Sequence, residues 1–361
     1  MTTKTDLERA GRVAAQLEEA GADVLLVTGA VNVRWLTGFT GSSGLALVGA
    51  DGVREFVTDF RYLSQSAEQL DPGWERHIVP ELVAAVPQLL GQATRLGFDD
   101  AAVTVKEHAR LQELVGEDVT LVPTAGLVEG LRAVKDEGEL ARIRAAAQLA
   151  DAALQDVLTR GLAGRTEREV GLDLEFTMRR MGAEAVSFSP IIAAGTHGAL
   201  PHASPRDVEI PSGTLVVVDW GAQLDGYASD CTRTYATGEL DERDAEIYAT
   251  VLAAQEAALA AVQPGPTGKE VDAVARDIIQ AAGHGEHFGH GLGHGVGMEV
   301  HEGPRLSKLG TVPLAAGHVV TVEPGIYVPG AVGVRIEDLV AVTEDGHEVL
   351  SSLPKALTVV A

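Results

Sequence analysis

The chain has 361 residues, of which 45% are apolar and 22% are charged, a balance typical of globular proteins and not of disordered or fibrous ones. This length exceeds the size at which one hydrophobic core usually stops growing, so two domains are expected. The formal charge of −24, from 52 acidic and 28 basic residues, repels phosphate backbones and anionic lipid surfaces and argues against nucleic acid and membranes as partners.

The first part of the chain, residues 1–128, alternates helical and strand patterns. Its opening segment lacks the basic end, apolar stretch and small-residue cleavage site of a signal peptide, so no export is expected. Apolar spacing predicts helices over 7–20, 82–90 and 105–114, and short strands over 24–28, 44–48, 55–58 and 95–98. This alternation predicts an α/β domain.

A second domain is expected over residues 129–361. It opens with the apolar spacing of long helical structure over 128–158, broken by polar residues near 135–138. A helix over 166–181 follows. The remainder is rich in strands that end at glycine and proline, interrupted by helices over about 241–262 and 268–282.

Two features predict the compartment. No uninterrupted apolar run reaches the roughly 18 residues that suggest a membrane span. The single cysteine, Cys231, excludes an intramolecular disulfide and fits a reducing environment. We therefore expect a cytoplasmic protein.

The fragment LVVVDWGAQLDGYASDCTRT places two acidic residues eleven positions apart. A hairpin centred between Leu224 and Asp225, with Gly226 relaxing the turn, would set Asp219 directly opposite Asp230. Two carboxylates at cross-strand distance repel each other, and a bound cation removes that cost. The alternative is a pair of independent surface aspartates on a half-exposed hairpin.

The fragment VVTVEPGIYVPGAVGVRIEDLV repeats this geometry. Glu323 closes one apolar strand and Glu337 lies in another, with their midpoint at Gly330 in a Pro-Gly turn, so these two can also face each other. Arg335 projects from the same strand face as Glu337 and could bridge carboxylates without being a ligand. A structural salt bridge is the alternative for this arginine.

Glycine alternates with other residues through HFGHGLGHGVG, which leaves His290, Leu292 and His294 on one face if the segment is extended. Glycine on the other face allows close backbone approach. The spacing does not match the dinucleotide-binding pattern. A lone histidine is usually a polar loop residue, but His294 accompanies four carboxylates. This oxygen-rich set suits two divalent ions, with Mn²⁺ favoured and Co²⁺ or Zn²⁺ possible.

Together, the motifs VVVDWG, SDCTRT, GHGLGHGVG, TVEPGIY and VRIED resemble the five ligand motifs of the pita-bread metallopeptidases, and within them the Xaa-Pro peptidases aminopeptidase P and prolidase. By that resemblance, Asp219 would chelate one ion, while Asp230 and Glu337 would bridge both. His294 and Glu323 would complete the shell of the second ion.

The resemblance also implies residues that act on the substrate. His202 in LPHAS, His290 in GHGLGH and His301 in EVHE resemble histidines that contact the bound peptide and help to shuttle protons. Arg335 and Thr232 resemble residues that support the ligands. Glu323 is the candidate to accept a proton from the attacking water.

The fragments RWLTGFTGSSGLALV and VTDFRYLSQSAEQL are similar to the creatinase-like amino-terminal domain of this family and lean toward aminopeptidase P, although Phe60 stands where a glycine is usual. The resemblance implies an α/β creatinase-like domain over 1–128 followed by an α+β pita-bread catalytic domain over 129–361. It also implies a homo-oligomer, at least a dimer, that cleaves the N-terminal Xaa-Pro bond of short peptides with proline at position 2.

Several alternatives remain at this stage. A prolidase would accept only dipeptides, and a catalytically inactive peptide-binding module would usually have lost ligands. A methionine aminopeptidase has a similar ligand set but not the large N-terminal domain, and a creatinase-type amidinohydrolase typically lacks the ligands. Cys231 could be called a nucleophile, but it points to the opposite hairpin face from Asp230, so a packing thiol is expected.

Overall fold

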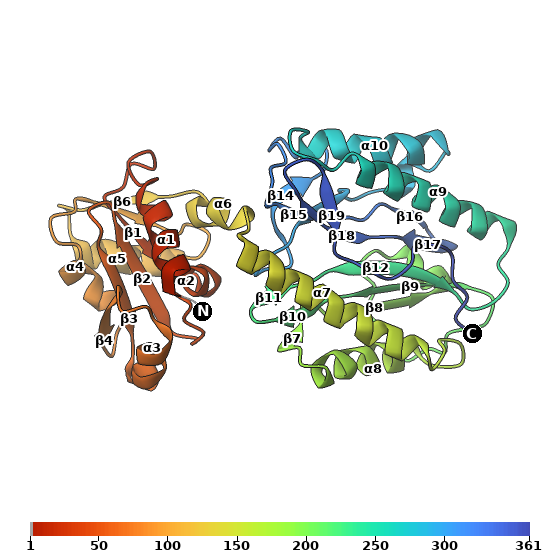
Figure 1. Cartoon of the computed structure of the whole chain (residues 1–361), viewed down its shortest axis with the longest axis horizontal. Helices are drawn as coiled ribbons and strands as arrows, with labels where there is room; N and C mark the ends of the chain where they lie inside the picture. Colours follow the sequence, from red (N-terminus) through yellow and green to blue (C-terminus); the bar gives the residue numbers. More distant parts are fainter. Residues whose placement is uncertain (1–2) are drawn as a thin grey trace. The chain divides into compact units, whose positions relative to one another are not determined.

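The computed structural model describes residues 3–361 and divides the chain into two compact units, with the boundary between Arg132 and Ala133 (Figure 1). None of the helices in the described part of the chain combines the length and apolar character needed to cross a membrane.

The N-terminal unit contains a six-stranded sheet with the strand order β4-β3-β2-β1-β5-β6. The pairs β1–β2 and β2–β3 are antiparallel and the other three are parallel. Its strands are β1 Val24–Val27, β2 Gly44–Gly49, β3 Arg54–Thr58, β4 Glu75–Ile78, β5 Arg95–Phe98 and β6 Thr120–Pro123. Its helices are α1 Thr3–Ala14, α2 Ala30–Thr37, α3 Leu63–Gln69, α4 Val86–Leu89, α5 Val105–Val115 and α6 Leu127–Ala133. The α/β prediction for this part of the chain is confirmed.

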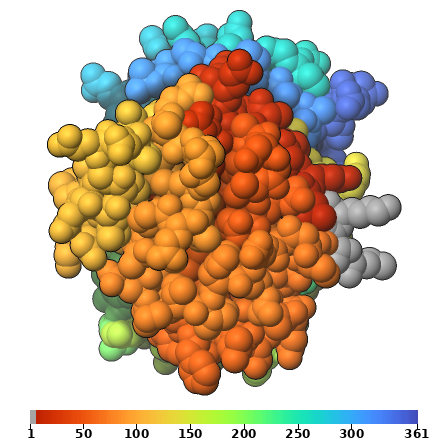
Figure 2. Space-filling view, turned by 90° about the vertical axis from the view of Figure 1, so that its left-hand side faces the viewer, coloured from red at the N-terminus to blue at the C-terminus, as the bar shows by residue number. Residues whose placement is uncertain are grey.

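Two predicted helices of this unit were too long. Residues 15–21 form turns after α1, and the segment predicted as 82–90 begins as the 3-10 helix η2 Val83–Ala85 before α4. Pro87 lies in the first turn of α4, where its missing N–H costs nothing. The helix α2 was not predicted, and it ends at Gly38, whose φ of 73° only glycine adopts readily. Figure 2 shows one face of this unit, largely covered by orange segments from the middle of its sequence.

The C-terminal unit has two pairs of helices with strands between them. The helices α9 Glu242–Ala260 and α10 Gly268–Ala281 lie on one side of the strands, and α7 Glu137–Leu158 and α8 Glu167–Arg180 on the other (Figure 1). Side-chain caps fix where each begins. Asp136, Thr166 and Thr267 each form a capping box with the glutamate three residues later, and Asp241 caps α9.

The strands of this unit form four sheets. Their orders are β12-β9-β8, β14-β13-β15-β18-β19, β11-β10-β7 and β16-β17. The strands are β7 Ala185–Val186, β8 Ile191–Ala194, β9 Leu215–Trp220, β10 Ala222–Leu224, β11 Tyr227–Ala228, β12 Cys231–Ala236, β13 Gly293–Gly295, β14 Glu302–Leu306, β15 Val319–Val322, β16 Gly325–Val328, β17 Val332–Arg335, β18 Asp338–Val342 and β19 His347–Val349.

Two hydrophobic clusters hold these layers together. One joins α7 and α8 to β8, β9 and β12, and the other joins α9 and α10 to the sheet that contains β15 and β18. Residues on both clusters are almost fully removed from water, which is the main favourable contribution to folding. The strands between the clusters are therefore held firmly from both sides, and polar side chains on them can be placed accurately.

Candidate active site

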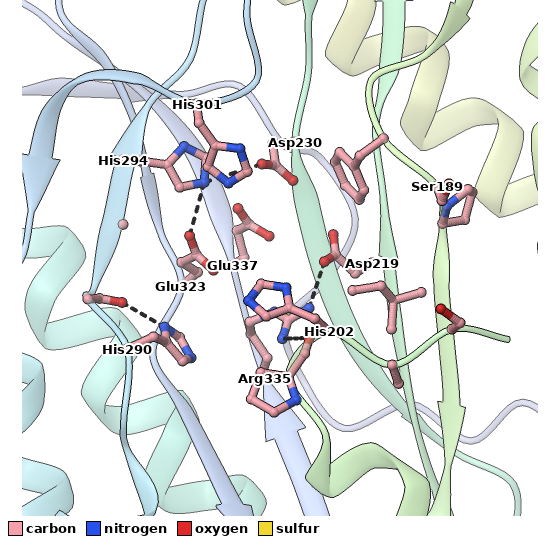
Figure 3. Close-up of a pocket in the computed structure, with 18 of the residues that line it drawn as sticks. Ser189, His202, Asp219, Asp230, His290, His294, His301, Glu323, Arg335 and Glu337 are labelled. Carbon is pink, nitrogen blue, oxygen red and sulfur yellow. Dashed lines mark hydrogen bonds and ion pairs between the residues drawn. The ribbon is translucent and has the colours of Figure 1, made fainter.

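A cavity of about 430 Å³ lies between the strands of the C-terminal unit (Figure 3). All nine residues predicted to have a catalytic or metal-binding role line this cavity. They are His202, Asp219, Asp230, His290, His294, His301, Glu323, Arg335 and Glu337.

The hairpin that carries Asp219 and Asp230 has a different register from the predicted one. Asp219 pairs with Thr232, not with Asp230. The turn consists of Asp225 and Gly226, with φ of 49° and 79°, and a two-residue turn of this kind matches the twist of the flanking strands. The turn centre therefore lies one residue further along than predicted, which shifts the pairing by two residues. Side chains alternate with a period of two, so both carboxylates still share one face.

The predicted register of the second hairpin is correct. Val328 pairs with Val332 around Gly330, and the same register continues in β15 and β18, where Val322 pairs with Asp338. Glu323 and Glu337 fall between these two ladders. Their backbone N–H groups instead donate to other segments, Glu323 to the Leu292 carbonyl at 2.8 Å and Glu337 to the Thr232 carbonyl at 3.0 Å.

The prediction of a single extended face for His290, Leu292 and His294 was wrong. Only Gly293–Gly295 is a strand, and Leu292 packs in the hydrophobic core while the two histidines line the cavity. The predicted close backbone approach is confirmed. A Cβ on Gly293 would lie 2.0 Å from the Thr321 carbonyl oxygen, and one on Gly295 would lie 2.0 Å from that of Gly303.

Three carboxylates meet at the centre of the site. Asp219, Asp230 and Glu337 are buried, and each offers a ligand oxygen within 4.8 Å of the others. Burial, followed by repulsion from neighbouring carboxylates, raises the pKa of Asp230 and of Glu337 well above the usual values. Asp219 Oδ1 is buried without a hydrogen-bond partner. A cation among these oxygens would satisfy that atom and remove the repulsion, so the residues fit a metal site.

His294 stands beside this cluster. Its Nε2 lies 3.2 Å from Glu323 Oε1 and 3.5 Å from Asp230 Oδ2 (Figure 3). Burial alone would raise the pKa of Glu323, but the hydrogen bond and charge of His294 outweigh it and lower that pKa to about 2. The imidazole thus occupies a position from which it could share a cation with Glu323 and Asp230.

Arg335 links the carboxylate cluster to other polar groups. Its Nη2 lies 2.6 Å from Asp219 Oδ2, and its Nε donates to Thr232 Oγ1 at 3.0 Å. Thr232 in turn donates to Glu337 Oε2 at 2.7 Å. Arg335 is therefore a buried ion-pair partner of Asp219 and holds two of the three carboxylates in place, one directly and one through the threonine.

Tyr327 was not identified from the sequence, yet it joins two of the predicted residues. Arg335 Nη1 donates to its hydroxyl at 2.8 Å, and His290 Nε2 lies 3.0 Å from the same oxygen. His290 Nδ1 lies 2.7 Å from the Gly291 carbonyl, which can only accept, so Nε2 accepts the tyrosine proton. Burial also lowers the pKa of His290, consistent with a neutral ring. Both ring nitrogens are thus engaged.

The loop that carries His290 is fixed from helix α10. Arg276 donates to the carbonyls of Phe288 and His290 at 2.9 and 2.8 Å, and its guanidinium lies over the Phe288 ring. Asp272 forms an ion pair with Arg276 and accepts the N–H of Leu292 at 3.0 Å. Asp272 and Arg276 lie outside the sequence motifs, because the end of α10 and a turn separate them from the loop.

Two other histidines are exposed on the cavity wall. The ring centroids of His301 and His294 are 4.1 Å apart, and burial followed by the charge of His294 lowers the pKa of His301. His202 lies in the loop between β8 and β9. Cys231, by contrast, packs in the core against α7 and α8, and its thiol donates to the Glu337 carbonyl. Burial raises the pKa of this thiol well above its usual value, which does not suit a nucleophile.

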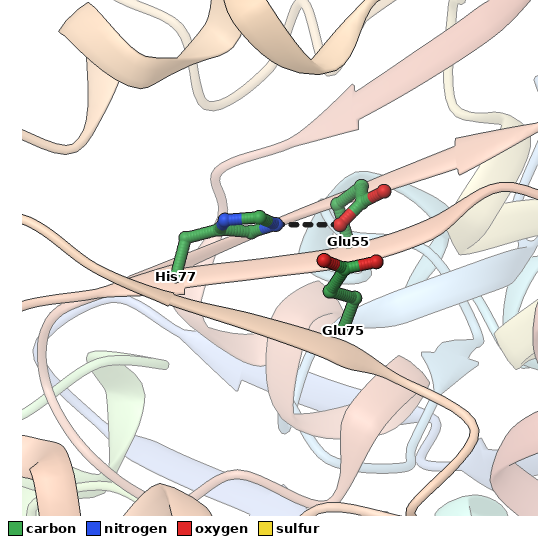
Figure 4. Close-up of side chains that lie close together, drawn as sticks. All are labelled: Glu55, Glu75 and His77. Atoms are coloured by element: carbon green, nitrogen blue, oxygen red, sulfur yellow. Dashed lines mark hydrogen bonds and ion pairs between the residues drawn. The ribbon is translucent and has the colours of Figure 1, made fainter.

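A second group of potential ligands lies in the N-terminal unit. Glu55, Glu75 and His77 come from the neighbouring strands β3 and β4 (Figure 4). His77 Nε2 already pairs with Glu55 at 2.6 Å, and Glu75 is exposed. We assign no function to this cluster.

Comparison with known proteins gives concordant matches over both units. Metallopeptidase family M24 matches residues 141–344, and the creatinase/prolidase N-terminal domain matches residues 9–134. The Xaa-Pro dipeptidase of Pyrococcus furiosus is 35% identical over 356 residues, which cover 97% of this chain and 99% of that protein.

Two solved structures resemble the chain over nearly its whole length. One is the Xaa-Pro dipeptidase from Bacillus anthracis, with a TM-score of 0.95, 40% identity, and coverage of 98% of this chain and 99% of that chain. The other is an X-Pro aminopeptidase from Thermotoga maritima, with a TM-score of 0.88, 36% identity, and coverage of 94% and 98%.

Proposed function

Since the chain belongs to metallopeptidase family M24 and carries a creatinase/prolidase N-terminal domain, we propose that it is an Xaa-Pro aminopeptidase that releases the first residue of short peptides with proline in second position. The predicted fold, a creatinase-like domain followed by a pita-bread catalytic domain, is confirmed by these matches. The protein is a metallo-exopeptidase, and its relatives act on Xaa-Pro bonds.

The observation that carries the proposal is the buried carboxylate cluster with its unsatisfied oxygen on Asp219. Enzymes of this family use two metal ions. The residues that would hold them are Asp219, Asp230, His294, Glu323 and Glu337. We propose Mn²⁺ as the ion, with Co²⁺ or Zn²⁺ as alternatives, because carboxylate oxygens form most of the donor set. When bound, the two ions would polarise the scissile carbonyl and lower the pKa of the attacking water.

The protein side chains would divide the remaining tasks. Glu323 is the proposed acceptor of a proton from the attacking water, because its carboxylate lines the cavity and lies beside His294. Arg335 donates to Asp219 and orients its carboxylate. His202 and His301 are exposed toward the cavity and can donate to the substrate carbonyl or the departing nitrogen. His290 would have to break its hydrogen bond with Tyr327 before it could transfer a proton, so its proposed role is mainly to shape the cavity.

The cavity also suits proline. Proline has no amide N–H, so its recognition depends on shape and apolar contact. Five apolar side chains line the cavity, namely Phe188, Pro190, Ile191, Pro201 and Pro205. A pyrrolidine ring could lie against them while the scissile carbonyl faces the carboxylate cluster.

A second candidate function is that of a prolidase, which cleaves only dipeptides. The similarity to the dipeptidase from Bacillus anthracis supports a prolidase, and the similarity to the aminopeptidase from Thermotoga maritima supports an aminopeptidase about equally well. We favour the aminopeptidase because RWLTGFTGSSGLALV and VTDFRYLSQSAEQL in the N-terminal unit lean toward aminopeptidase P.

The two functions can be separated by one assay. Release of alanine from Ala-Pro and from Ala-Pro-Ala would be measured with added Mn²⁺, with the Asp230→Ala variant and Ala-Ala-Ala as controls. An aminopeptidase cleaves the tripeptide, and a prolidase cleaves only the dipeptide. Equal cleavage of Ala-Ala-Ala, or turnover retained in the variant, would refute the proposal.

We also propose where and in what form the protein works. Its one cysteine is a free, buried thiol, which fits the reducing environment of the cytoplasm. By resemblance to its family we expect a homodimer. Short peptides are the proposed partners, and nucleic acid and membranes are not.

A further inference from the structure

One wall of the cavity is a single loop, residues 195–205, which connects β8 to the approach of β9 and begins with the 3-10 helix η3 Gly195–Ala199. Consecutive residues of this loop line the cavity, and none of them belongs to the proposed metal ligands. They are Pro201, His202, Ala203, Ser204 and Pro205. The loop therefore lines the cavity without contributing a proposed ligand.

Both ends of this loop are bound to one carboxylate. Glu167, the first residue of α8, is 1% exposed and accepts the backbone N–H of Ala194 and that of Arg206, each at 3.0 Å. The Arg206 guanidinium adds two parallel hydrogen bonds, from Nε and Nη2, also at 3.0 Å. His197, inside the loop, places Nδ1 3.0 Å from Glu167 Oε1. A single buried side chain thus closes the loop at its base.

The charge of Glu167 is well compensated. Burial alone would raise the pKa of Glu167, but the Arg206 hydrogen bonds and the two backbone N–H groups outweigh it and lower that pKa. Hydrogen bonds between a charged fork and a carboxylate are roughly twice as strong as neutral ones. The two ends of the loop are therefore held in fixed positions beside Glu167.

The middle of the loop is attached to the catalytic strands. The Pro201 carbonyl accepts a hydrogen bond from Arg335 Nη1 at 3.2 Å. Gly198 packs so closely on Gly333 of β17 that a Cβ on Gly333 would lie 1.7 Å from the Gly198 oxygen. With its base held by Glu167 and its middle held here, the loop has a defined position relative to the carboxylate cluster.

We infer that Glu167 is a positioning residue, which together with Arg206 fixes loop 195–205 as the substrate-side wall and sets His202 against the bound peptide. This role rests on the proposed function, because it concerns how the same site holds its peptide. Release of the base should leave the metal ions in place, since the loop supplies no proposed ligand. It should weaken peptide binding more than it slows the chemical step, because His202 is one of two histidines proposed to donate to the substrate.

The kinetic test replaces Arg206 by methionine. Arg206 is 46% exposed, so Arg206→Met should fold. The control is Arg144→Met, because the Arg144 side chain is 37% exposed and makes two hydrogen bonds to Glu348 on another surface. We expect KM for Ala-Pro to rise about tenfold in Arg206→Met while kcat changes by less than about threefold, with metal content unchanged. Arg206→Lys, which keeps the charge but not the fork, should recover part of the loss.

Hydrogen exchange of the full-length variants gives a readout that does not require turnover. Peptides covering 195–205 should exchange faster in Arg206→Met than in the wild type, while those from α9 and α10 stay unchanged, and Arg144→Met should match the wild type throughout. Unaltered exchange in 195–205, acceleration across the whole unit, or a fall in kcat with KM unchanged would each overturn the inference. If the wild type cleaves no Xaa-Pro peptide, the proposed function fails but the exchange result still decides the role of Glu167.

Discussion

At the scale of single residues, the site concentrates charges that folding alone would not favour. Asp219, Asp230 and Glu337 are all buried, and the pKa of each is raised, first by burial. A buried carboxylate without compensation destabilises the folded protein. The cluster is therefore best explained as a cation-binding site that lowers the stability of the metal-free protein. Such a trade-off between stability and function is common at active sites.

Asp230→Asn tests this explanation. The substitution removes one ionisable carboxyl group while keeping the shape of the side chain. We expect the metal-free variant to be more stable than the metal-free wild type by about 1–2 kcal/mol, and its turnover to fall roughly a thousandfold or more. Chemical denaturation in the presence of a chelator measures the first effect and peptide release the second. A variant less stable than the wild type in chelator would contradict the account.

His318 provides a pH-dependent test away from the site. It is buried, and its Nδ1 accepts the backbone N–H of Ala315, so the ring is neutral. Burial, followed by the charge of Lys135, lowers its pKa from 6.5 to about 4. Between these pH values the unfolded chain binds more protons than the folded one, so the stabilisation is complete above pH 6.5 and is lost as the pH falls toward 4.

The wild type should accordingly lose up to about 2 kcal/mol of unfolding free energy through His318 across that range, after allowance for partial screening by solvent. His318→Gln, which keeps an acceptor for the Ala315 N–H, should have a shallower pH dependence. The measurement is urea unfolding of both proteins at several pH values. Parallel curves for the two proteins would mean that His318 does not carry the effect.

Residues that lie in motifs could be found from the sequence, and residues that support them could not. Short spacing and strand alternation pointed to Glu323 and Glu337 because one hairpin places both. Tyr327, Asp272 and Glu167 are also buried, but each acts through contacts with segments that are distant along the chain. No periodicity in the sequence records such pairings, so only the folded structure reveals them.

At the scale of elements, helices with strong caps were predicted well and hairpin register less reliably. The helices α8, α9 and α10 begin within one residue of their predicted starts, each directly after a capping residue. The β9–β12 hairpin was predicted two residues out of register because the turn centre was taken one residue too early, before Asp225 and not within the Asp-Gly pair. The error left the facing of the two carboxylates unchanged, since a shift of two residues preserves strand faces.

The strand β13 allows a prediction about backbone approach. Gly293→Ala would place a Cβ 2.0 Å from the Thr321 carbonyl, which forces β13 away from β15 and displaces His294. We expect a loss of at least about 2 kcal/mol in stability and a large fall in metal affinity. Gly289→Ala is the matched control, because nothing lies within 4 Å of its added Cβ. Thermal unfolding and metal titration of the pair should differ sharply, and equal behaviour would rule out the close-approach explanation.

At the scale of the whole molecule, two units share one chain, and the nine predicted site residues all lie in the C-terminal one. The division of the chain into an α/β unit and a unit of strands covered by helices was predicted from length, composition and periodicity. The assembly state did not, because an interface leaves no periodic signal in the sequence.

The expected assembly is a homodimer. Light scattering on the purified protein should give a mass of about twice the 37.7 kDa of one chain. The result should not depend on added nucleic acid, which the charge of −24 disfavours as a partner. A mass of 37.7 kDa at all accessible concentrations would exclude the dimer.

The central claim is that the carboxylate cluster and His294 form a two-metal centre that hydrolyses Xaa-Pro bonds. The most direct test is to titrate chelator-treated protein with Mn²⁺ while measuring release of alanine from Ala-Pro. The account predicts no turnover without metal and a rise to a plateau at about two equivalents of Mn²⁺ per chain, with no rise for Asp230→Asn. Turnover in excess chelator, or two bound equivalents with no hydrolysis of any Xaa-Pro peptide, would contradict it.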